Sequence, residues 1–385
     1  MHVLALPKWY PGRNDPQLGD FIRKQVLAAA RHVRMSVLFV VPLEGLAGDH
    51  EQELDERDGA WELRCYYRPD RSAFAPWRKL VNYRRYRQAT RAGLARLWKE
   101  RGKPDLVHVH ILLRPALTAR MLLRKHGIPY LISEQSSEYL DGRFAAKHAG
   151  SKTLHRRLFR QASAITAVSA WLGDGLVKLG LCERYDVVPN VVPGLDRPLP
   201  APGAAGSFMV VADLVDGTKN VSGVLRALAS ARTMVPTLTL DIIGDGPDAD
   251  MLKALATSIG IGQAVRFHGR LANTDVLRRM AGTGSVIINS NVETFSVVTG
   301  EALASGKPVI ATRCGGPVAF VTPENGLLID VRSDGQLANA MLTINREHAR
   351  YDPAAVRCSV SDHFSVEAVG CAFLAIYQRH APNAG

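Results

Sequence analysis

The segment 285–312 constrains the fold of this chain more than any other. Short β-rich apolar runs occupy 285–288 and 308–312, and good helix formers occupy 297–305 between them. A strand, a helix and a second strand in this order predict a parallel sheet covered by helices. The loop before the helix therefore follows the carboxyl end of a strand, where open α/β sheets bind ligands.

Two carboxylates lie eight residues apart in this segment, Glu293 in the loop and Glu301 about one turn into the helix. Between them, Ser296 is predicted as an N-cap whose hydroxyl accepts a hydrogen bond from a first-turn amide. Free amides at the helix start would form an anion site, and carboxylates accept hydrogen bonds from sugar hydroxyls. By spacing alone, an ordinary loop acid and a solvated helix acid explain the carboxylates equally well. The residues at the predicted helix start are Phe295, Ser296, Val297 and Val298.

The stretch from Glu293 to Glu301, with the Gly-Lys-Pro turn at 306–308 and the Gly-Gly-Pro run at 315–317, resembles the E-x7-E signature of the retaining family 4 glycosyltransferases. These enzymes have the GT-B fold, with two Rossmann-like domains facing a central cleft. The resemblance implies that Glu293 binds hydroxyls of the donor sugar and that Glu301 binds the ribose of the nucleotide. It also implies a reaction without a metal or cofactor. Ser296 stands where relatives often have glycine.

Composition fits a two-domain globular protein. The 385 residues are too many for one ordinary core, and 46% are hydrophobic and 22% charged. No stretch approaches the ~20 apolar residues of a membrane span, and no charged region precedes an apolar one at the N-terminus, so we expect a cytoplasmic protein. The five cysteines are scattered and contain no C-x-x-C pair. We therefore expect reduced thiols rather than a metal site or a disulfide framework.

The net charge of +12 is concentrated in residues 77–101, which contain nine basic residues and one acid. Such a helix could pack through an apolar stripe, hold an anionic membrane leaflet on the inner face of the membrane, or do both. The basic charge is not spread over several elements and no nucleic-acid module accompanies it, so we expect no nucleic-acid partner. The stripe consists of Tyr83, Tyr86, Thr90, Leu94, Leu97 and Trp98.

The first half of the chain alternates strands and helices, with strands predicted at 3–6, 36–41 and 105–110, a helix at 20–34 and an exposed acidic loop at 47–58. Alternation places His108 and His110 on one side of their strand. The resemblance implies that Gly19 faces the cleft and that His110 reaches the donor sugar. A plain loop glycine and a structural histidine remain open.

The segment 126–139 is predicted as a strand that continues into a polar loop. Glu134 and Glu138 are candidate acceptor-site groups there. Gln135 stands where relatives often have histidine, so no acid–base role is expected at that position.

In the second half, Lys219 matches the lysine with which relatives grip the donor diphosphate, while Asp213 stands where a companion arginine is common. Gly244 lies in a glycine turn after a strand, where it permits close backbone approach. Arg270 ends a segment whose backbone meets the nucleotide base in relatives.

Five prolines in 189–203 predict an interdomain connector, with a boundary near Leu195. The resemblance implies an acceptor-binding domain at 1–195, a nucleotide-sugar-binding domain at 196–360 and a terminal helix within 361–385 that returns to the first domain. The last helix is predicted over 363–377.

The predicted activity is transfer of a sugar, with retention, from a nucleoside diphosphate sugar to a hydroxyl acceptor. The basic, aromatic helix favours an acceptor that is a lipid-linked or polysaccharide intermediate. Two alternatives stay open: a nucleotide-sugar epimerase on the same scaffold, and a non-catalytic sugar-nucleotide binding protein.

Overall fold

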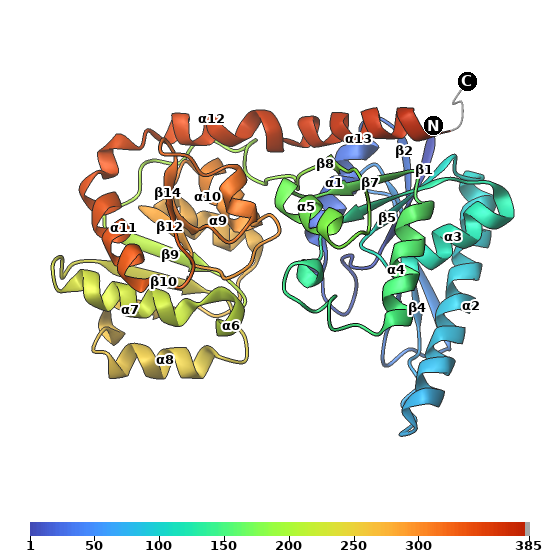
Figure 1. The fold of residues 1–385 in the computed structure, drawn as a ribbon, viewed down its shortest axis with the longest axis horizontal. Coiled ribbons are helices and arrows are strands. Elements are labelled where there is room, and N and C mark those ends of the chain that lie inside the picture. Colours follow the sequence, from blue (N-terminus) through green and yellow to red (C-terminus); the bar gives the residue numbers. More distant parts are fainter. Residues whose placement is uncertain (382–385) are drawn as a thin grey trace. The chain divides into compact units, whose positions relative to one another are not determined.

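The structure, a computed structural model, describes residues 1–381. The chain forms two compact units, Met1–Val191 together with the segment that begins at Val366, and Val192–Ser365 (Figure 1). The chain first passes from one unit to the other between Val191 and Val192, three residues before Leu195. Val191 belongs to the first core, while Val192 donates its amide to Phe364 of the second unit.

The first unit is built on an eight-stranded sheet in the order β3-β4-β2-β1-β5-β6-β7-β8, parallel except for the β3–β4 pair. Every residue of β1, β5 and β6 is buried, as expected for strands covered on both faces. The strands are β1 His2–Pro7, β2 Arg34–Pro42, β3 His50–Asp55, β4 Trp61–Tyr67, β5 Leu106–His110, β6 Tyr130–Glu134, β7 Ala164–Ala167 and β8 Asp186–Val187. The helices are α1 Asp20–Ala30, α2 Ala75–Arg101, α3 Arg114–His126, α4 Ala149–Gln161, α5 Ala170–Lys178 and α13 Val366–His380.

The exposed acidic loop predicted at 47–58 is wrong, because β3 forms there as an antiparallel partner of β4. Arginines neutralise its carboxylates: Arg13 pairs with Glu51 and Glu53, and Arg57 pairs with Asp55. An acidic segment can therefore hold an edge position, where charged side chains also discourage pairing with another chain.

The second unit contains a six-stranded parallel sheet in the order β11-β10-β9-β12-β13-β14. The predicted strand, helix and strand of 285–312 are confirmed as β12, α10 and β13, with Val286 opposite Val309. The strand order reverses between β9 and β12, which makes their carboxyl ends the topological switch point where such sheets bind ligands. The strands are β9 Ser207–Val211, β10 Thr239–Ile243, β11 Val265–Phe267, β12 Ser285–Ile288, β13 Val309–Thr312 and β14 Gly326–Ile329. The helices are α6 Asp216–Lys219, α7 Val221–Arg232, α8 Ala249–Ser258, α9 Asn273–Gly282, α10 Val297–Ala304, α11 Asp334–Arg346 and α12 Pro353–Phe364.

Two predicted helix boundaries need correction. The helix predicted at 20–34 ends at Ala30, because Arg34 already begins β2. The helix predicted over 363–377 is two helices, since Ser365 adopts extended backbone between α12 and α13. Within the first unit, α13 packs on α1, and its Val369, Phe373 and Tyr377 are fully buried in the same core as Ile22 and Val26 of α1.

Candidate functional site

Lys219 and Glu293 meet at the carboxyl edge of the second sheet. Lys219 ends α6, which follows β9, and Glu293 lies in the loop after β12, the neighbouring strand. The Lys219 Nζ lies 2.5 Å from Glu293 Oε1, and Ser290 Oγ donates to the same oxygen at 2.7 Å. The side chain of Lys219 is 25% exposed and that of Glu293 is 16% exposed. The pair is thus held at the switch point but remains reachable by a ligand.

The Gly-Gly run fixes the backbone of the Glu293 loop. Glu293 donates its amide to Cys314 O at 3.1 Å and accepts from the Gly316 amide at 2.8 Å. A Cβ at Gly316 would lie 2.4 Å from Phe295 O, and Gly315 has φ +121°. Glycines at these positions therefore allow the two loops to approach closely.

The start of α10 is uncapped by side chains. Ser296 is the N-cap residue as predicted, but its hydroxyl bonds Thr299 Oγ1 at 2.7 Å rather than a backbone amide. The predicted hydroxyl–amide bond is wrong because Ser296 is left-handed, with φ 74°. This conformation also favours glycine. First-turn amides, including those of Val297 and Val298, lack intrahelical acceptors and are suited to an anion.

Glu301 is not a solvated helix acid. Its residue is 4% exposed, and Asn273 Nδ2 of α9 donates to its Oε1 at 2.8 Å. Phe295 is buried beside Phe320 and Phe364, and so anchors the loop rather than facing solvent. Sequence reasoning missed Asn273, because no local pattern links a residue 28 positions away to Glu301.

The loops after β9, β10 and β11 also lie together. Gly244 has φ +138°, and a Cβ there would lie 1.8 Å from Ala212 O. Gly244 donates its amide to Gly269 O at 2.9 Å. Next to Gly269, the Arg270 guanidinium lies 3.3 Å from Asp213 Oδ1. A cation from the loop after β11 thus reaches Asp213 in the loop after β9.

A cavity of about 280 Å³ borders α6 in this unit, and sequence reasoning did not find it. Asn291 at its wall donates through Nδ2 to Gly217 O at 2.8 Å and accepts from Arg332 at 3.3 Å. These bonds brace the helix that carries Lys219. The lining residues are Asp216, Gly217, Asn220, Arg226, Asn291, Arg332 and Asp334.

His110 lies in the first unit and is completely buried at the end of β5. Its ring stacks 3.8 Å from that of His108, which confirms the prediction that both lie on one side of the strand. His108 bonds Tyr377 and Ser133, but neither ring nitrogen of His110 has a hydrogen-bond partner within residues 1–381. Burial lowers the pKa of His110 to about 3, so the ring is neutral, with one nitrogen a donor and the other an acceptor.

Acid should destabilise the first unit through these histidines. Burial lowers the pKa of His108 well below its usual value, as it does that of His110. Each takes up a proton on unfolding below about pH 6.5, so stability is complete above that pH and falls as the pH drops toward the folded-state pKa. The free energy of unfolding should fall by about 1.4 kcal/mol per pH unit for each ring. Burial also lowers the pKa of His2, His155 and His380 in this unit, so these rings add to the slope. Calorimetry between about pH 7 and 5 measures the total, and His110→Gln should reduce the slope by the share of one ring. An unchanged slope in that variant would contradict the assignment.

The remaining first-unit candidates, Gly19, Glu134 and Glu138, all have contacts that explain them structurally. Gly19 has φ +67°, and a Cβ would lie 2.5 Å from the Trp9 carbonyl, so glycine permits the tight entry into α1. Glu134 is buried and accepts the amides of Leu112, Gln135 and Ser136, whereas Glu138 pairs with Lys147 at 3.0 Å. Burial raises the pKa of Glu134, and its bonds make it a backbone brace.

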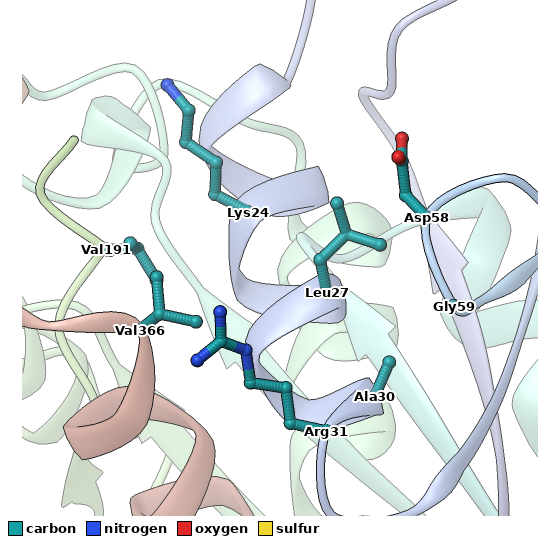
Figure 2. A pocket seen from close by; sticks show the side chains of 8 residues that line it. All are labelled: Lys24, Leu27, Ala30, Arg31, Asp58, Gly59, Val191 and Val366. Atoms are coloured by element: carbon teal, nitrogen blue, oxygen red, sulfur yellow. The ribbon is translucent and has the colours of Figure 1, made fainter. Parts of the chain in front are cut away.

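Another cavity, of about 480 Å³, lies in the first unit along α1 and contains none of the predicted site residues. Figure 2 shows Lys24 and Leu27 on α1 and Arg31 at its end, with Asp58 on one side and Val366 on the other. Its lining combines apolar side chains with three charged ones, Lys24, Arg31 and Asp58, and differs from the polar groups gathered at the switch point. None of the helices within residues 1–381 is long and apolar enough to cross a membrane.

Two family models match the chain. "Glycosyl transferases group 1" matches residues 205–352, and "Glycosyl transferase 4-like domain" matches residues 20–191. Among curated relatives, glycogen synthase from Mycobacterium tuberculosis is 26% identical over 304 residues, 74% of this chain and 70% of that protein. The lipopolysaccharide core biosynthesis glycosyltransferase LpsE from Rhizobium meliloti is 28% identical over 242 residues, 60% of this chain and 69% of that protein.

Solved structures share the fold at low identity. Sucrose-phosphate synthase from Thermosynechococcus elongatus has a TM-score of 0.73 at 17% identity, covering 98% of this chain and 99% of that one. Anabaena HepE in complex with UDP has a TM-score of 0.70 at 17% identity, covering 98% and 100%. With the two parallel-sheet units and the family matches, these findings identify the chain as a glycosyltransferase with the GT-B fold.

Proposed function

We propose that this glycosyltransferase moves a sugar from a nucleoside diphosphate sugar to a hydroxyl acceptor with retention at the anomeric carbon. The observation that carries the proposal is the Lys219–Glu293 pair beside the uncapped start of α10. An ammonium and free amides suit a diphosphate, and a neighbouring carboxylate suits sugar hydroxyls. The Anabaena relative was crystallised with UDP, which agrees with a donor of this class.

In the proposed reaction, the bond from the anomeric carbon to the diphosphate oxygen breaks and the diphosphate keeps the electron pair. Lys219 and the amides near Val297 and Val298 stabilise the charge that develops on that oxygen. The acceptor oxygen bonds to the anomeric carbon on the same face, and its proton passes to the leaving diphosphate. Glu293 orients the sugar, and Glu301 accepts from the ribose. These groups could do the work of a metal ion.

Product analysis tests the proposal. The chain is incubated with UDP-, GDP- and ADP-sugars, with and without a lipid-linked saccharide acceptor, and both nucleotide release and the anomeric configuration are followed by NMR. Nucleoside diphosphate release that needs the acceptor, with retained configuration, supports transfer. Isomerised sugar without an acceptor would indicate an epimerase, and an inverted product would overturn retention. The curated relatives are synthases and glycosyltransferases, and nothing in them favours the epimerase.

Arg270 is proposed to be the second cation, besides Lys219, that binds the donor diphosphate. It would take the place of the companion arginine that is absent at position 213, where this chain has Asp213. Their side chains are 56% and 73% exposed, and an ion pair this exposed contributes at most about 1 kcal/mol. Arg270 can therefore leave Asp213 for a phosphate at little cost.

Asp213→Ala should accordingly tighten binding of the nucleoside diphosphate several-fold, because it frees Arg270 and removes a repelling carboxylate. Arg270→Ala should weaken binding about 10-fold, and both effects should shrink in high salt. Isothermal titration measures them. Arg266→Ala is the control, since Arg266 is an exposed arginine of the adjacent strand β11. Weaker binding in Asp213→Ala would contradict this role.

The N-terminal part of α2 is proposed to bind an anionic membrane surface. The C-terminal part of the predicted stripe is buried, including Tyr86, Leu94 and Leu97, and packs on the sheet. The first turns differ: Phe74 is 69% exposed, Trp77 52% and Leu80 43%, on a helix end that extends past the sheet (Figure 1). Exposed aromatic and aliphatic side chains with basic neighbours suit the headgroup region of a bilayer. The exposed basic neighbours are Lys79, Arg84, Arg87 and Arg91.

Neutralising Lys79, Arg84 and Arg91 to Gln should weaken liposome binding about 100-fold, at roughly 1 kcal/mol per basic residue. Flotation with anionic vesicles at physiological salt measures the bound fraction. The matched control removes three exposed arginines from α4, Arg156, Arg157 and Arg160, and should bind as the parent does. Equal loss in both variants would reduce the effect to net charge and contradict a site on α2. A membrane site of this kind would suit a lipid-linked acceptor.

A further inference from the structure

Three metal-ligating side chains meet in the first unit where α13 contacts the end of α1. His32 comes from the turn between α1 and β2, and Glu367 and Cys371 lie one turn apart on α13. In the part of the chain that the structure describes, this is the only set of three such side chains whose donor atoms all lie within 4.8 Å of one another. None of the three belongs to the proposed sugar-transfer site.

The spacing of the donor atoms matches the edges of a zinc tetrahedron. Zn²⁺ binds His nitrogen and carboxylate oxygen at about 2.0–2.1 Å and Cys sulfur at about 2.3 Å, so tetrahedral angles place nitrogen and oxygen about 3.4 Å apart, and sulfur about 3.6 Å from each. His32 Nε2 lies 3.5 Å from Glu367 Oε1, Cys371 Sγ lies 3.9 Å from His32 Nε2, and it lies 3.3 Å from Glu367 Oε1. Shifts of a few tenths of an ångström would complete the geometry.

The backbone around the cluster keeps these donors close together. A Cβ at Gly370 would lie 2.5 Å from Ala28 O and 2.8 Å from His32 Nε2. Glycine at 370 therefore lets the imidazole lie directly against α13. The His32 side chain is 17% exposed and that of Glu367 is 63% exposed. The cluster is therefore largely covered at the imidazole and open to solvent at the carboxylate. The open side leaves room for a water as a fourth ligand.

We propose that His32, Glu367 and Cys371 form a Zn²⁺ site, completed by one water, that fastens α13 to the turn after α1. The expectation of a free reduced thiol is thereby revised for Cys371. Because α13 starts immediately after Ser365, the ion would hold the chain where it re-enters the first unit. This role is independent of the proposed donor and acceptor.

A plain hydrogen-bond network is the competing interpretation. Without a metal, the Cys371 thiol donates to Glu367 at 3.3 Å, and this bond raises the pKa of the thiol. Zinc would displace the thiol proton, so binding should release a proton and strengthen as the pH rises. The network alone predicts neither effect.

The test uses the full chain, freed of metal by a chelator and kept in a non-thiol reductant. Zn²⁺ is titrated against a chromophoric indicator, and Co²⁺ is used as a spectroscopic probe. We expect one ion per chain with a dissociation constant in the micromolar range or below, and a thiolate-to-cobalt charge-transfer band. Zinc should also raise the melting temperature and protect Cys371 from alkylation.

Cys371→Ser should weaken zinc binding at least 100-fold and abolish the charge-transfer band, and His32→Gln should weaken binding at least 10-fold. Cys358→Ser is the matched control, because Cys358 is the other exposed cysteine and lies on α12. It should bind zinc as the parent does. Sub-stoichiometric binding by the parent, or a Cys371→Ser variant that binds as tightly, would overturn the proposal. A Glu367→Gln variant with unaltered affinity would overturn the three-ligand set.

Discussion

Lys219→Ala should lower kcat/KM for sugar transfer by about 10²–10³-fold, the loss expected when one preorganised charge-stabilising group is removed. Lys219 is the cation that the proposed mechanism places on the leaving diphosphate, and its ammonium already lies 2.5 Å from Glu293 Oε1. Without it, a partly buried carboxylate would face the donor diphosphate with Ser290 as its remaining side-chain donor. Repulsion would then add to the lost attraction. Steady-state rates of nucleoside diphosphate release measure the effect.

Two further variants separate catalysis from folding. Lys253→Ala removes an exposed lysine of α8 that pairs with Asp250, and should leave the rate unchanged. Glu293→Gln should lower the rate as well, and the double variant should lose less than the product of the two single losses, because the side chains act as a pair. The melting temperature of Lys219→Ala should stay near that of the parent. A rate for Lys219→Ala equal to that of Lys253→Ala would remove Lys219 from the mechanism.

The position of the Glu293 loop could be predicted because residues close together in sequence determine it. The run from Glu293 to the Gly-Gly loop includes a strand end, a helix start and glycines that a close backbone approach requires, so its place at the sheet edge could be predicted. The histidines also followed from alternation along one strand. In both cases, residues close in sequence decided the geometry.

Other features depend on residues far apart in sequence, and no local pattern could reveal them. The acidic strand β3 exists because Arg13 neutralises Glu51 and Glu53 from about 40 positions away. Asn273 reaches Glu301, and Arg270 reaches Asp213, across separate strands and helices. The sequence could not show which part of α2 is buried and which is exposed. The spacing of its apolar residues continues along the part of the helix that has no sheet to pack on.

Gly244→Ala should destabilise the second unit by more than about 3 kcal/mol and abolish donor binding. The new methyl group would lie 1.8 Å from Ala212 O, far inside van der Waals contact, and φ +138° is a conformation that alanine avoids. The clash is with backbone, so no side-chain rotation relieves it. Relief would need the β9 and β10 loops to separate, which would break the bonds from the Ala212 amide to Ile243 O and from the Leu214 amide to Asp245 O. Gly244 would also be pushed toward Gly269, next to Arg270. Calorimetry and titration with a nucleoside diphosphate measure the two losses.

Gly260→Ala separates the clash from the backbone preference. Gly260 lies in the same unit, after α8, and has φ +76°. No atom lies within 4 Å of the place where its Cβ would stand, so alanine there meets only the left-handed backbone cost of about 1–2 kcal/mol. This variant should melt a few degrees lower and bind the nucleotide as the parent does. If Gly244→Ala behaved in the same way, the close approach of the two loops would not be needed for the donor site, and the nucleotide would have to be bound elsewhere on this sheet edge.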